Sequence, residues 1–278
     1  MREFKPKVIY IAIDGPRSNN PTDADQVTRS IALTERIDWP CKVERLIRNE
    51  NMGCKYGVSS AIDWFFSEVE EGIILEDDCL PDISFFSFCA ELLARYRNVP
   101  AVMHIGGSNL AHGKWWGNDS YLFTKVTHIW GWASWRRAWH QYDLEMKSYP
   151  NNRDTLVNQF VIDPSSRQMW KQAFDSTYAG KIDTWDYQWV YSIWLKNGLS
   201  VLPSVNLISN IGFDASATHT KFVTEFAELP TGALPILYHP SVVQEHNEAT
   251  QWLFRYLYRQ PSRLSVWFDR VKRKFTKS

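Results

Sequence analysis

Three consecutive carboxylates, Glu76, Asp77 and Asp78, follow a short apolar run in the stretch "GIILEDDCLP". Adjacent carboxylates repel one another, and they become favourable when a hard divalent cation takes oxygen ligands from one or two of them and from the phosphates of a substrate. Mg²⁺ or Mn²⁺ with a diphosphate fits this chemistry. The alternative for an isolated acidic triplet is a solvated turn that also begins the next helix.

The residues around the triplet predict alternating strands and helices. Strands are predicted at "VIYIAI", typical of a strand buried on both faces of a parallel sheet, and at "CKVERLIR", "IIL" and "AVMHIGGSN". Helices are predicted over residues 24–37, from Val58 to Val69, and after Asp82 as N-cap. This alternation predicts an α/β domain with a largely parallel sheet, followed by a less regular, tryptophan-rich half. Ligands bind beyond the carboxyl ends of such strands, where the triplet lies.

Composition narrows the class of protein. The 278 residues are 44% hydrophobic, which indicates a globular chain with a sizeable core. Basic and acidic residues number 31 each, so charge gives no reason to expect nucleic acid as a partner. The four cysteines lack metal-type spacing, the first residues "MREFKPK" do not resemble a signal peptide, and no apolar run reaches the roughly 20 residues that cross a bilayer. These features favour a cytoplasmic protein.

Six blocks of sequence carry a resemblance to a known family. In order they are "VIYIAIDGPR", "RNENMGCKYGVSSAIDWFF", "ILEDDCLPD", "HIWGWASWRRAW", "TWDYQWVYSIW" and "NLISNIGFDASATHT". Their order and style resemble bacterial nucleotide-diphosphosugar glycosyltransferases of the GT-A fold. They are also similar to the Golgi N-acetylglucosaminyltransferase that starts complex N-glycans. The resemblance covers most of residues 4 to 247 and implies a Rossmann-like, mostly parallel sheet flanked by helices.

The resemblance implies a role for each matching residue. Asp14 would contact the nucleotide base, and Asn51 and Gly53 belong to the loop that passes under the nucleotide. Asp78 would be the direct ligand of Mn²⁺ or Mg²⁺, while Glu76 and Asp77 would orient the ribose and the water bound to the metal. Asp186 would be the catalytic base of an inverting transfer, and His219 is a candidate contact for the diphosphate.

Each role has a structural alternative. Asp186 could cap a helix that runs through Trp189, and Asp14 in "DGPR" could be a turn residue. The loop "NENMGCKYG" resembles a phosphate cradle only loosely, because it lacks the lysine and serine of a P-loop. Most of the tryptophans are expected in the core rather than on a sugar ring; they are Trp130, Trp132, Trp135, Trp139 and Trp185.

The resemblance also implies that a first strand and helix of the family domain are missing from this sequence. In the family that strand is central in the sheet. Its loss would leave two neighbouring strands with unpaired backbone groups and an apolar slot between them. We therefore expect the reading frame to continue upstream, or the sheet to be abnormal.

The C-terminal end differs from the rest of the chain in charge. We therefore predict two parts: a glycosyltransferase domain of residues 1–250 and a basic tail of residues 251–278. The tail has eight basic and one acidic residue, net +7, whereas the preceding part has 23 and 30, net −7. An amphipathic helix is predicted after Pro261, with Leu264, Trp267 and Phe268 among its apolar residues. It could lie on an anionic membrane, on the inner face, or pack on the domain.

The predicted function is a metal-dependent, inverting transfer of a sugar from a nucleotide-diphosphate donor to a glycan or lipid-linked acceptor. One alternative is a sugar-nucleotide pyrophosphorylase, whose glycine-rich loop with lysine and arginine is not visible here. The other is an inactive carbohydrate-binding relative of the same fold. The sequence does not identify the sugar, the base or the acceptor.

Overall fold

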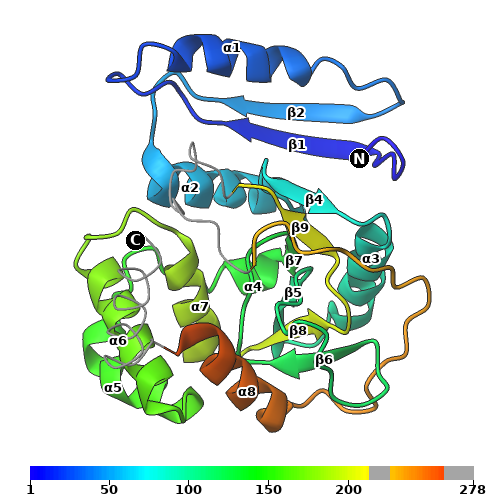
Figure 1. Ribbon diagram of the computed structural model, residues 1–278. Helices are drawn as coiled ribbons and strands as arrows, with labels where there is room; N and C mark the ends of the chain where they lie inside the picture. Colours follow the sequence, from blue (N-terminus) through cyan, green and yellow to red (C-terminus); the bar gives the residue numbers. More distant parts are fainter. Residues whose placement is uncertain (213–225, 260–278) are drawn as a thin grey trace, which may run out of the picture.

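The computed structural model describes residues 1–212 and 226–259 of the chain (Figure 1). The predicted contact by His219 and the predicted amphipathic helix of residues 261–278 lie outside the described residues. The first three elements form a separate unit, drawn at the top of Figure 1. They are strand β1 (Val8–Ile13), helix α1 (Asp23–Leu33) and strand β2 (Lys42–Ile47). The strands pair in parallel from Val8 opposite Lys42 to Ile13 opposite Ile47, as the intervening helix requires.

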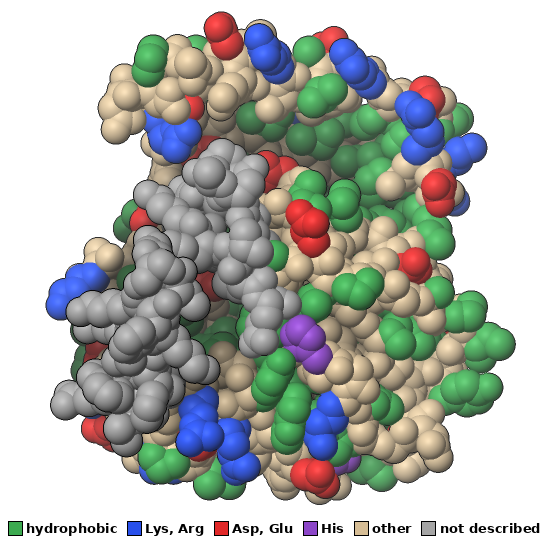
Figure 2. Space-filling model, viewed as in Figure 1, with side chains coloured by type: hydrophobic (Ala, Val, Ile, Leu, Met, Phe, Trp, Pro, Cys, Tyr) green, Lys and Arg blue, Asp and Glu red, His purple; other side chains and the backbone are tan. Residues whose placement is uncertain are grey.

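The prediction that "VIYIAI" is buried on both faces is wrong, although the strand itself is confirmed as β1. Every β1 side chain is partly or fully exposed, and Val8 is 44% exposed. Among the described strands, β1 is hydrogen-bonded to β2 alone, so one edge of it faces no other strand. Figure 2 shows hydrophobic side chains lining a hollow beneath this unit.

A five-stranded sheet forms the centre of the molecule, in the order β3-β7-β5-β8-β6. Its strands are β3 (Glu71–Ile74), β5 (Val102–Gly106), β6 (Tyr121–Thr124), β7 (Trp132–Trp135) and β8 (Leu199–Pro203). The sheet is mixed, so the prediction of a mostly parallel sheet is wrong. Strands β3, β5 and β8 run in one direction, but β7 lies antiparallel between β3 and β5, and β6 is antiparallel to β8. No helix lies between β5 and its antiparallel neighbour β7 in the sequence, and only parallel neighbours need such a crossover.

Helices cover the central sheet on both faces (Figure 1). Successive side chains of a strand point to opposite faces, so Trp132 belongs to one core cluster and Ala133 to the other. Helix α3 (Ser84–Tyr96) packs on the face of Ala133, and its first turn is fixed by Asp82, whose Oδ1 accepts a hydrogen bond from Ser84 N at 2.8 Å. The other face is covered by α2 (Gly53–Glu68), α4 (Arg136–Trp139), α5 (Tyr149–Phe160), α6 (Pro164–Tyr178), α7 (Asp186–Leu195) and α8 (Asn247–Tyr258).

The tryptophan-rich half is more regular than predicted, since four of these helices, α5 to α8, lie in it. Helix α7 is "DYQWVYSIWL", in which all seven residues from Gln188 to Trp194 are buried, so it shows no polar stripe that would reveal a helix. Helix α8 continues across the predicted boundary at residues 250/251. Among the helices of residues 1–212 and 226–259, none combines the length and apolar character needed to cross a bilayer.

The tryptophans predicted to be core residues are confirmed as such. Trp132, Trp135, Trp139 and Trp185 are at most 3% exposed, and Trp130 is partly buried. The ring of Trp132 stacks on that of Trp185 at 5.7 Å between centroids. Aromatic rings therefore fill the space between the sheet and helix α7, which fixes where α7 begins.

Two histidines are buried in this core. The Nε2 of His104 lies 2.9 Å from the carbonyl oxygen of His128, and its Nδ1 accepts a hydrogen bond from Trp189 Nε1 at 3.3 Å. The ring of His104 also stacks on Trp132 at 5.2 Å. Burial lowers the pKa of His104 to about 3 and that of His128 to about 4. Both side chains are therefore neutral at neutral pH.

Acid should destabilise the fold through these histidines. Because their folded pKa values are lowered, the unfolded chain binds more protons below about pH 6.5. The free energy of unfolding should fall as the pH drops from about 6.5 towards about 4, by at most about 1.4 kcal/mol per pH unit for each histidine. Thermal melts over this range check the slope. His104→Gln should melt lower at neutral pH but with a shallower slope, whereas the exposed His140→Gln should keep the wild-type slope. Equal slopes in all three proteins would contradict the assignment.

Candidate functional site

The acidic triplet lies between β3 and the short strand β4 (Cys79–Pro81), at the carboxyl end of β3 as predicted. Glu76 and Asp78 are partly buried, whereas Asp77 is exposed. One ligand atom from each of Glu76, Asp78 and Cys79 lies within 4.8 Å of the others. The Cys79 thiol also lies 3.6 Å from Asp78 Oδ1. Two of the three predicted carboxylates therefore share one small volume with a thiol.

The surroundings of Glu76 favour the protonated form of its carboxyl group. Burial and the negative charges of Asp78, Asp186 and Asp77 raise the pKa of Glu76 to about 8, against a smaller opposing effect of a hydrogen bond from the Trp185 side chain. Asp186 thus acts on Glu76 although 110 positions separate them in the sequence. The predicted base therefore lies within electrostatic range of the predicted metal-site residue Glu76.

The backbone of a second strand closes over Asp78. Strand β9 (Ile208–Asn210) pairs with β4, and Ile211 N donates to the Asp78 carbonyl oxygen at 2.9 Å. A Cβ placed on Gly212 would lie only 2.2 Å from Asp78 Oδ2, so any larger residue there would displace the carboxylate. Gly212 therefore allows the chain to pass directly against Asp78.

Asp186 is the first residue of α7, which follows the buried Trp185. Its Oδ1 accepts hydrogen bonds from Tyr187 N at 2.9 Å and from the Thr184 hydroxyl. The alternative role of Asp186, to stabilise the start of a helix, is thus partly supported, because its carboxylate accepts hydrogen bonds at the beginning of α7. These bonds also fix its orientation, which a base needs.

The N-terminus of α2 adjoins this site through Asp183. The carboxylate of Asp183 accepts hydrogen bonds from Cys54 N and Lys55 N, both at 2.9 Å. Gly53 has a φ of +72°, and a Cβ there would lie 2.6 Å from Asp183 Oδ2. Burial and the charges of Asp186, Glu76 and Asp183 raise the pKa of the Cys54 thiol to about 12. Cys54 is therefore a neutral thiol surrounded by carboxylates.

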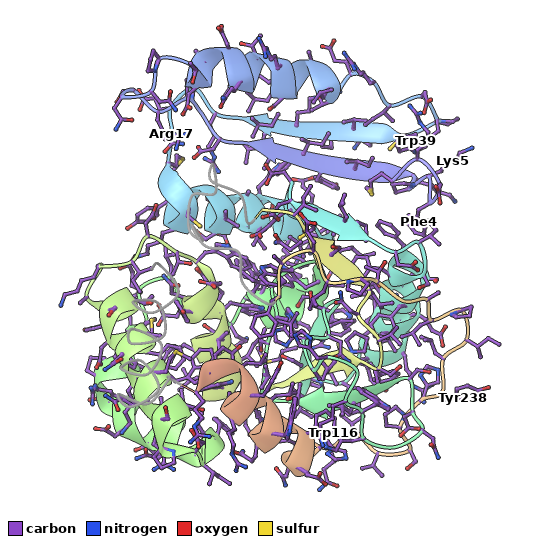
Figure 3. The ribbon with its side chains drawn as sticks, viewed as in Figure 1. Phe4, Lys5, Arg17, Trp39, Trp116 and Tyr238 are labelled. Carbon is purple, nitrogen blue, oxygen red and sulfur yellow. The ribbon has the colours of Figure 1, made fainter. Side chains whose placement is uncertain are left out.

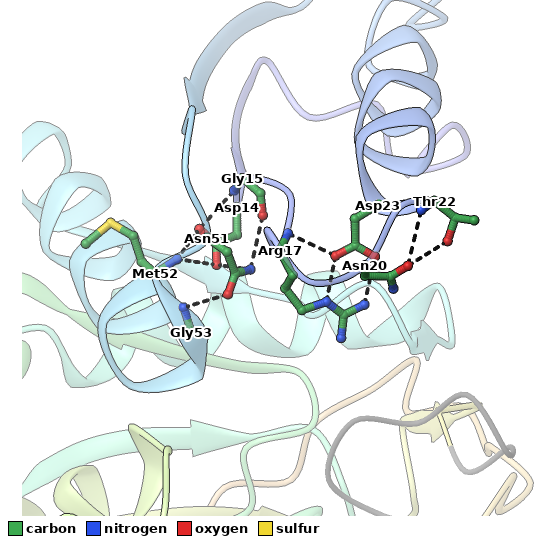
Figure 4. A network of polar contacts seen from close by, with 9 residues as sticks. All are labelled: Asp14, Gly15, Arg17, Asn20, Thr22, Asp23, Asn51, Met52 and Gly53. Atoms are coloured by element: carbon green, nitrogen blue, oxygen red, sulfur yellow. Dashed lines mark hydrogen bonds and ion pairs between the residues drawn. The ribbon is translucent and has the colours of Figure 1, made fainter.

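Asp14 and Asn51 form a second cluster at the end of β1 (Figure 4). The Asp14 carboxylate accepts hydrogen bonds from Gly15 N, Asn51 Nδ2 and Met52 N, each at 3.0 Å. Asn51 Oδ1 in turn accepts a bond from Gly53 N at 3.3 Å. The predicted nucleotide residues Asp14, Asn51 and Gly53 are thus brought together. Their bonds fasten the separate N-terminal unit to α2, which is consistent with the turn alternative for Asp14.

The donor set of the acidic group suits a hard divalent cation. Burial and the charges of Glu76 and Asp78 raise the pKa of the Cys79 thiol, so this sulfur stays protonated and is a poor ligand. The carboxylate oxygens of Glu76 and Asp78 remain, and oxygen is the donor that Mg²⁺ and Mn²⁺ prefer. Burial and the negative charges of Asp78, Asp186 and Asp77 raise the pKa of Glu76, and a cation bound there would favour its ionised form.

Sequence reasoning missed four residues of this region: Cys54, Cys79, Asp183 and Gly212. Asp183 had a visible signal, because it stands three positions before Asp186 in "KIDTWD". Cys79 directly follows the triplet in the sequence, whereas Cys54 and Gly212 gave no signal, since their roles depend on contacts between distant parts of the chain. Comparison with protein-family models finds no family that matches this chain, and comparison with curated proteins finds no significant match.

Proposed function

We propose that this protein is a metal-dependent, inverting glycosyltransferase of the GT-A type that uses a nucleotide-diphosphate sugar. The observation that supports the proposal is the pair of carboxyl groups of Glu76 and Asp78 at the carboxyl end of β3, near enough to Asp186 for its charge to raise the pKa of Glu76. The ordered resemblance of the six sequence blocks adds the family context.

Asp78 and Glu76 would hold Mn²⁺ or Mg²⁺, with Asp77 exposed beside them toward the ribose. When bound, the cation neutralises negative charge on the departing diphosphate. Asp14, Asn51 and Gly53 would contribute the nucleotide side of the site, across the N-terminus of α2. The buried Trp185 forms a side-chain hydrogen bond with Glu76 on the inner side of the site.

The transfer requires one proton acceptor from the protein. Asp186 would take the proton of the acceptor hydroxyl, whose oxygen forms the new bond to the anomeric carbon. At the same time the bond from that carbon to the diphosphate oxygen breaks, and the diphosphate leaves with the electron pair. The bonds from Tyr187 N and Thr184 hold the Asp186 carboxylate in place without protonating it.

Release of nucleoside diphosphate tests the proposed function. The protein is incubated with a panel of nucleotide sugars, each with Mn²⁺ and with a chelator. We expect slow release of nucleoside diphosphate from one member of the panel, dependent on the metal. Exchange of pyrophosphate would instead favour a sugar-nucleotide pyrophosphorylase. Neither reaction, with or without simple sugar acceptors, would favour a carbohydrate-binding protein.

A further inference from the structure

Helix α8 carries a second face that the core does not use. Its inner face, which includes Leu253 and Phe254, is buried against the sheet and α6. The opposite face carries Trp252, Arg255, Tyr256 and Arg259, at spacings i, i+3, i+4 and i+7, which place them in one stripe. Arg255, Tyr256 and Arg259 are exposed, and Trp252 is partly exposed. Figure 2 shows basic and hydrophobic side chains gathered over this helix.

The loop before β6 extends this surface. Figure 3 places Trp116 beside α8, and its ring meets that of Trp252 at 5.4 Å between centroids. Lys114 Nζ lies 5.2 Å from the centroid of Trp116 and 5.4 Å from that of Trp252. The Trp252 ring also stacks on Tyr256 at 4.6 Å. We call these six residues, Lys114, Trp116, Trp252, Arg255, Tyr256 and Arg259, the α8 surface.

The charge of the α8 surface is positive. Its three basic residues face two carboxylates: Glu248, which accepts a hydrogen bond from Trp116 Nε1 at 3.2 Å, and Asp163, which lies 3.9 Å from Arg255 Nε. Asp163 is mainly engaged at the start of α6, where it accepts bonds from Ser166 N and Oγ. Arg255, Tyr256, Arg259 and Trp252 also line an open depression of about 400 Å³.

We infer that the α8 surface docks on a bilayer that contains anionic phospholipids. Charge complementarity selects this occupant, because arginine and lysine bind anionic headgroups, while tryptophan and tyrosine are suited to the boundary between headgroups and acyl chains. All six residues lie on a helix and its neighbouring loop, so they can meet a flat surface together. This inference does not require the transfer reaction.

One consequence rests on the proposed function. The last turn of α8 lies near the start of α7, since the ring of Trp170 contacts both Tyr258, at 4.9 Å between centroids, and Tyr187, the neighbour of Asp186, at 5.9 Å. Docking through α8 would therefore bring Asp186 towards the membrane. An acceptor hydroxyl on a lipid-linked glycan would then be presented to it.

Co-sedimentation with vesicles tests the inference on the full chain. The vesicles are phosphatidylcholine alone or phosphatidylcholine with phosphatidylglycerol. We expect binding to the anionic vesicles only, weakened by salt. Arg255→Gln with Arg259→Gln should weaken binding about 30-fold, from the usual contribution of two cations near a charged bilayer. The matched control combines Arg29→Gln, on the exposed side of α1, with Arg36→Gln, exposed in the loop after α1, and should bind like wild type.

A second variant tests the inference even if the double substitution in α8 prevents folding. Lys114→Gln changes the loop rather than the helix and should weaken binding about 5-fold. Thermal melts establish that each variant is folded. Wild-type binding by a folded Arg255→Gln, Arg259→Gln variant would overturn the inference. It would also be overturned by absence of wild-type binding, or by binding to a soluble anionic polysaccharide alone. None of these outcomes depends on release of nucleoside diphosphate, so the membrane inference and the proposed function are tested independently.

Discussion

Replacing Asp186 with asparagine should lower turnover by about 10²-fold or more, while donor affinity stays close to that of wild type. The amide cannot accept the proton of the acceptor hydroxyl, yet its oxygen can still accept the bonds from Tyr187 N and Thr184. The start of α7 should therefore be preserved. Steady-state transfer rates and calorimetric donor affinity measure the two effects separately.

Two control variants distinguish proton transfer from loss of structure. Asp25→Asn, in the first turn of α1, should leave turnover unchanged. Asp183→Asn lies three positions before the candidate base and should lower the melting temperature, because Asp183 caps α2 through Cys54 N and Lys55 N. Turnover of Asp186→Asn close to that of wild type would show that another group takes the proton.

Local sequence patterns were sufficient for the elements near the N-terminus. The apolar stripe from Val58 to Val69 predicts α2. Asp82, predicted as the N-cap of α3, lies one residue before the N-cap Ile83 and accepts a hydrogen bond from Ser84 N. The burial of β1 could not be read from "VIYIAI", because a strand is buried by its neighbours and, among the described strands, β1 pairs with β2 alone. Strand β7 was not predicted, for a related reason. It pairs antiparallel with both β3 and β5, whereas a regular alternation of strands and helices predicts parallel pairing.

The candidate site was predictable residue by residue but not as an arrangement. The triplet at the end of β3 follows from the position of an apolar run before three carboxylates. The approach of Asp186 to Glu76 has no counterpart in the spacing of residues and depends on the packing of Trp132 on Trp185. The close passage of Gly212 against Asp78 likewise needs β9 beside β4, a pairing of two three-residue strands with no sequence signal.

Replacing Asp78 with alanine should abolish metal-dependent nucleotide binding while leaving the fold intact. Asp78 supplies one of the two carboxylates of the acidic group, and the remaining thiol of Cys79 is a poor ligand because its pKa is raised. Loss of the carboxylate also removes repulsion from Glu76, so the fold should not suffer. Asp77→Ala is the matched control, since it removes the same charge from an exposed neighbour. It should weaken binding and keep the metal dependence.

Calorimetric titration of wild type and Asp78→Ala with a nucleoside diphosphate, with and without Mn²⁺, tests the central claim most directly. The nucleoside diphosphate used is the one that the nucleotide-sugar panel releases. If the panel identifies none, each common nucleoside diphosphate is titrated in turn. We predict that wild type binds only with Mn²⁺ and that Asp78→Ala, with an unchanged melting profile, shows no difference between the two conditions. Equal metal-dependent affinity in the two proteins would contradict the metal site at the end of β3, and with it the proposed transfer reaction.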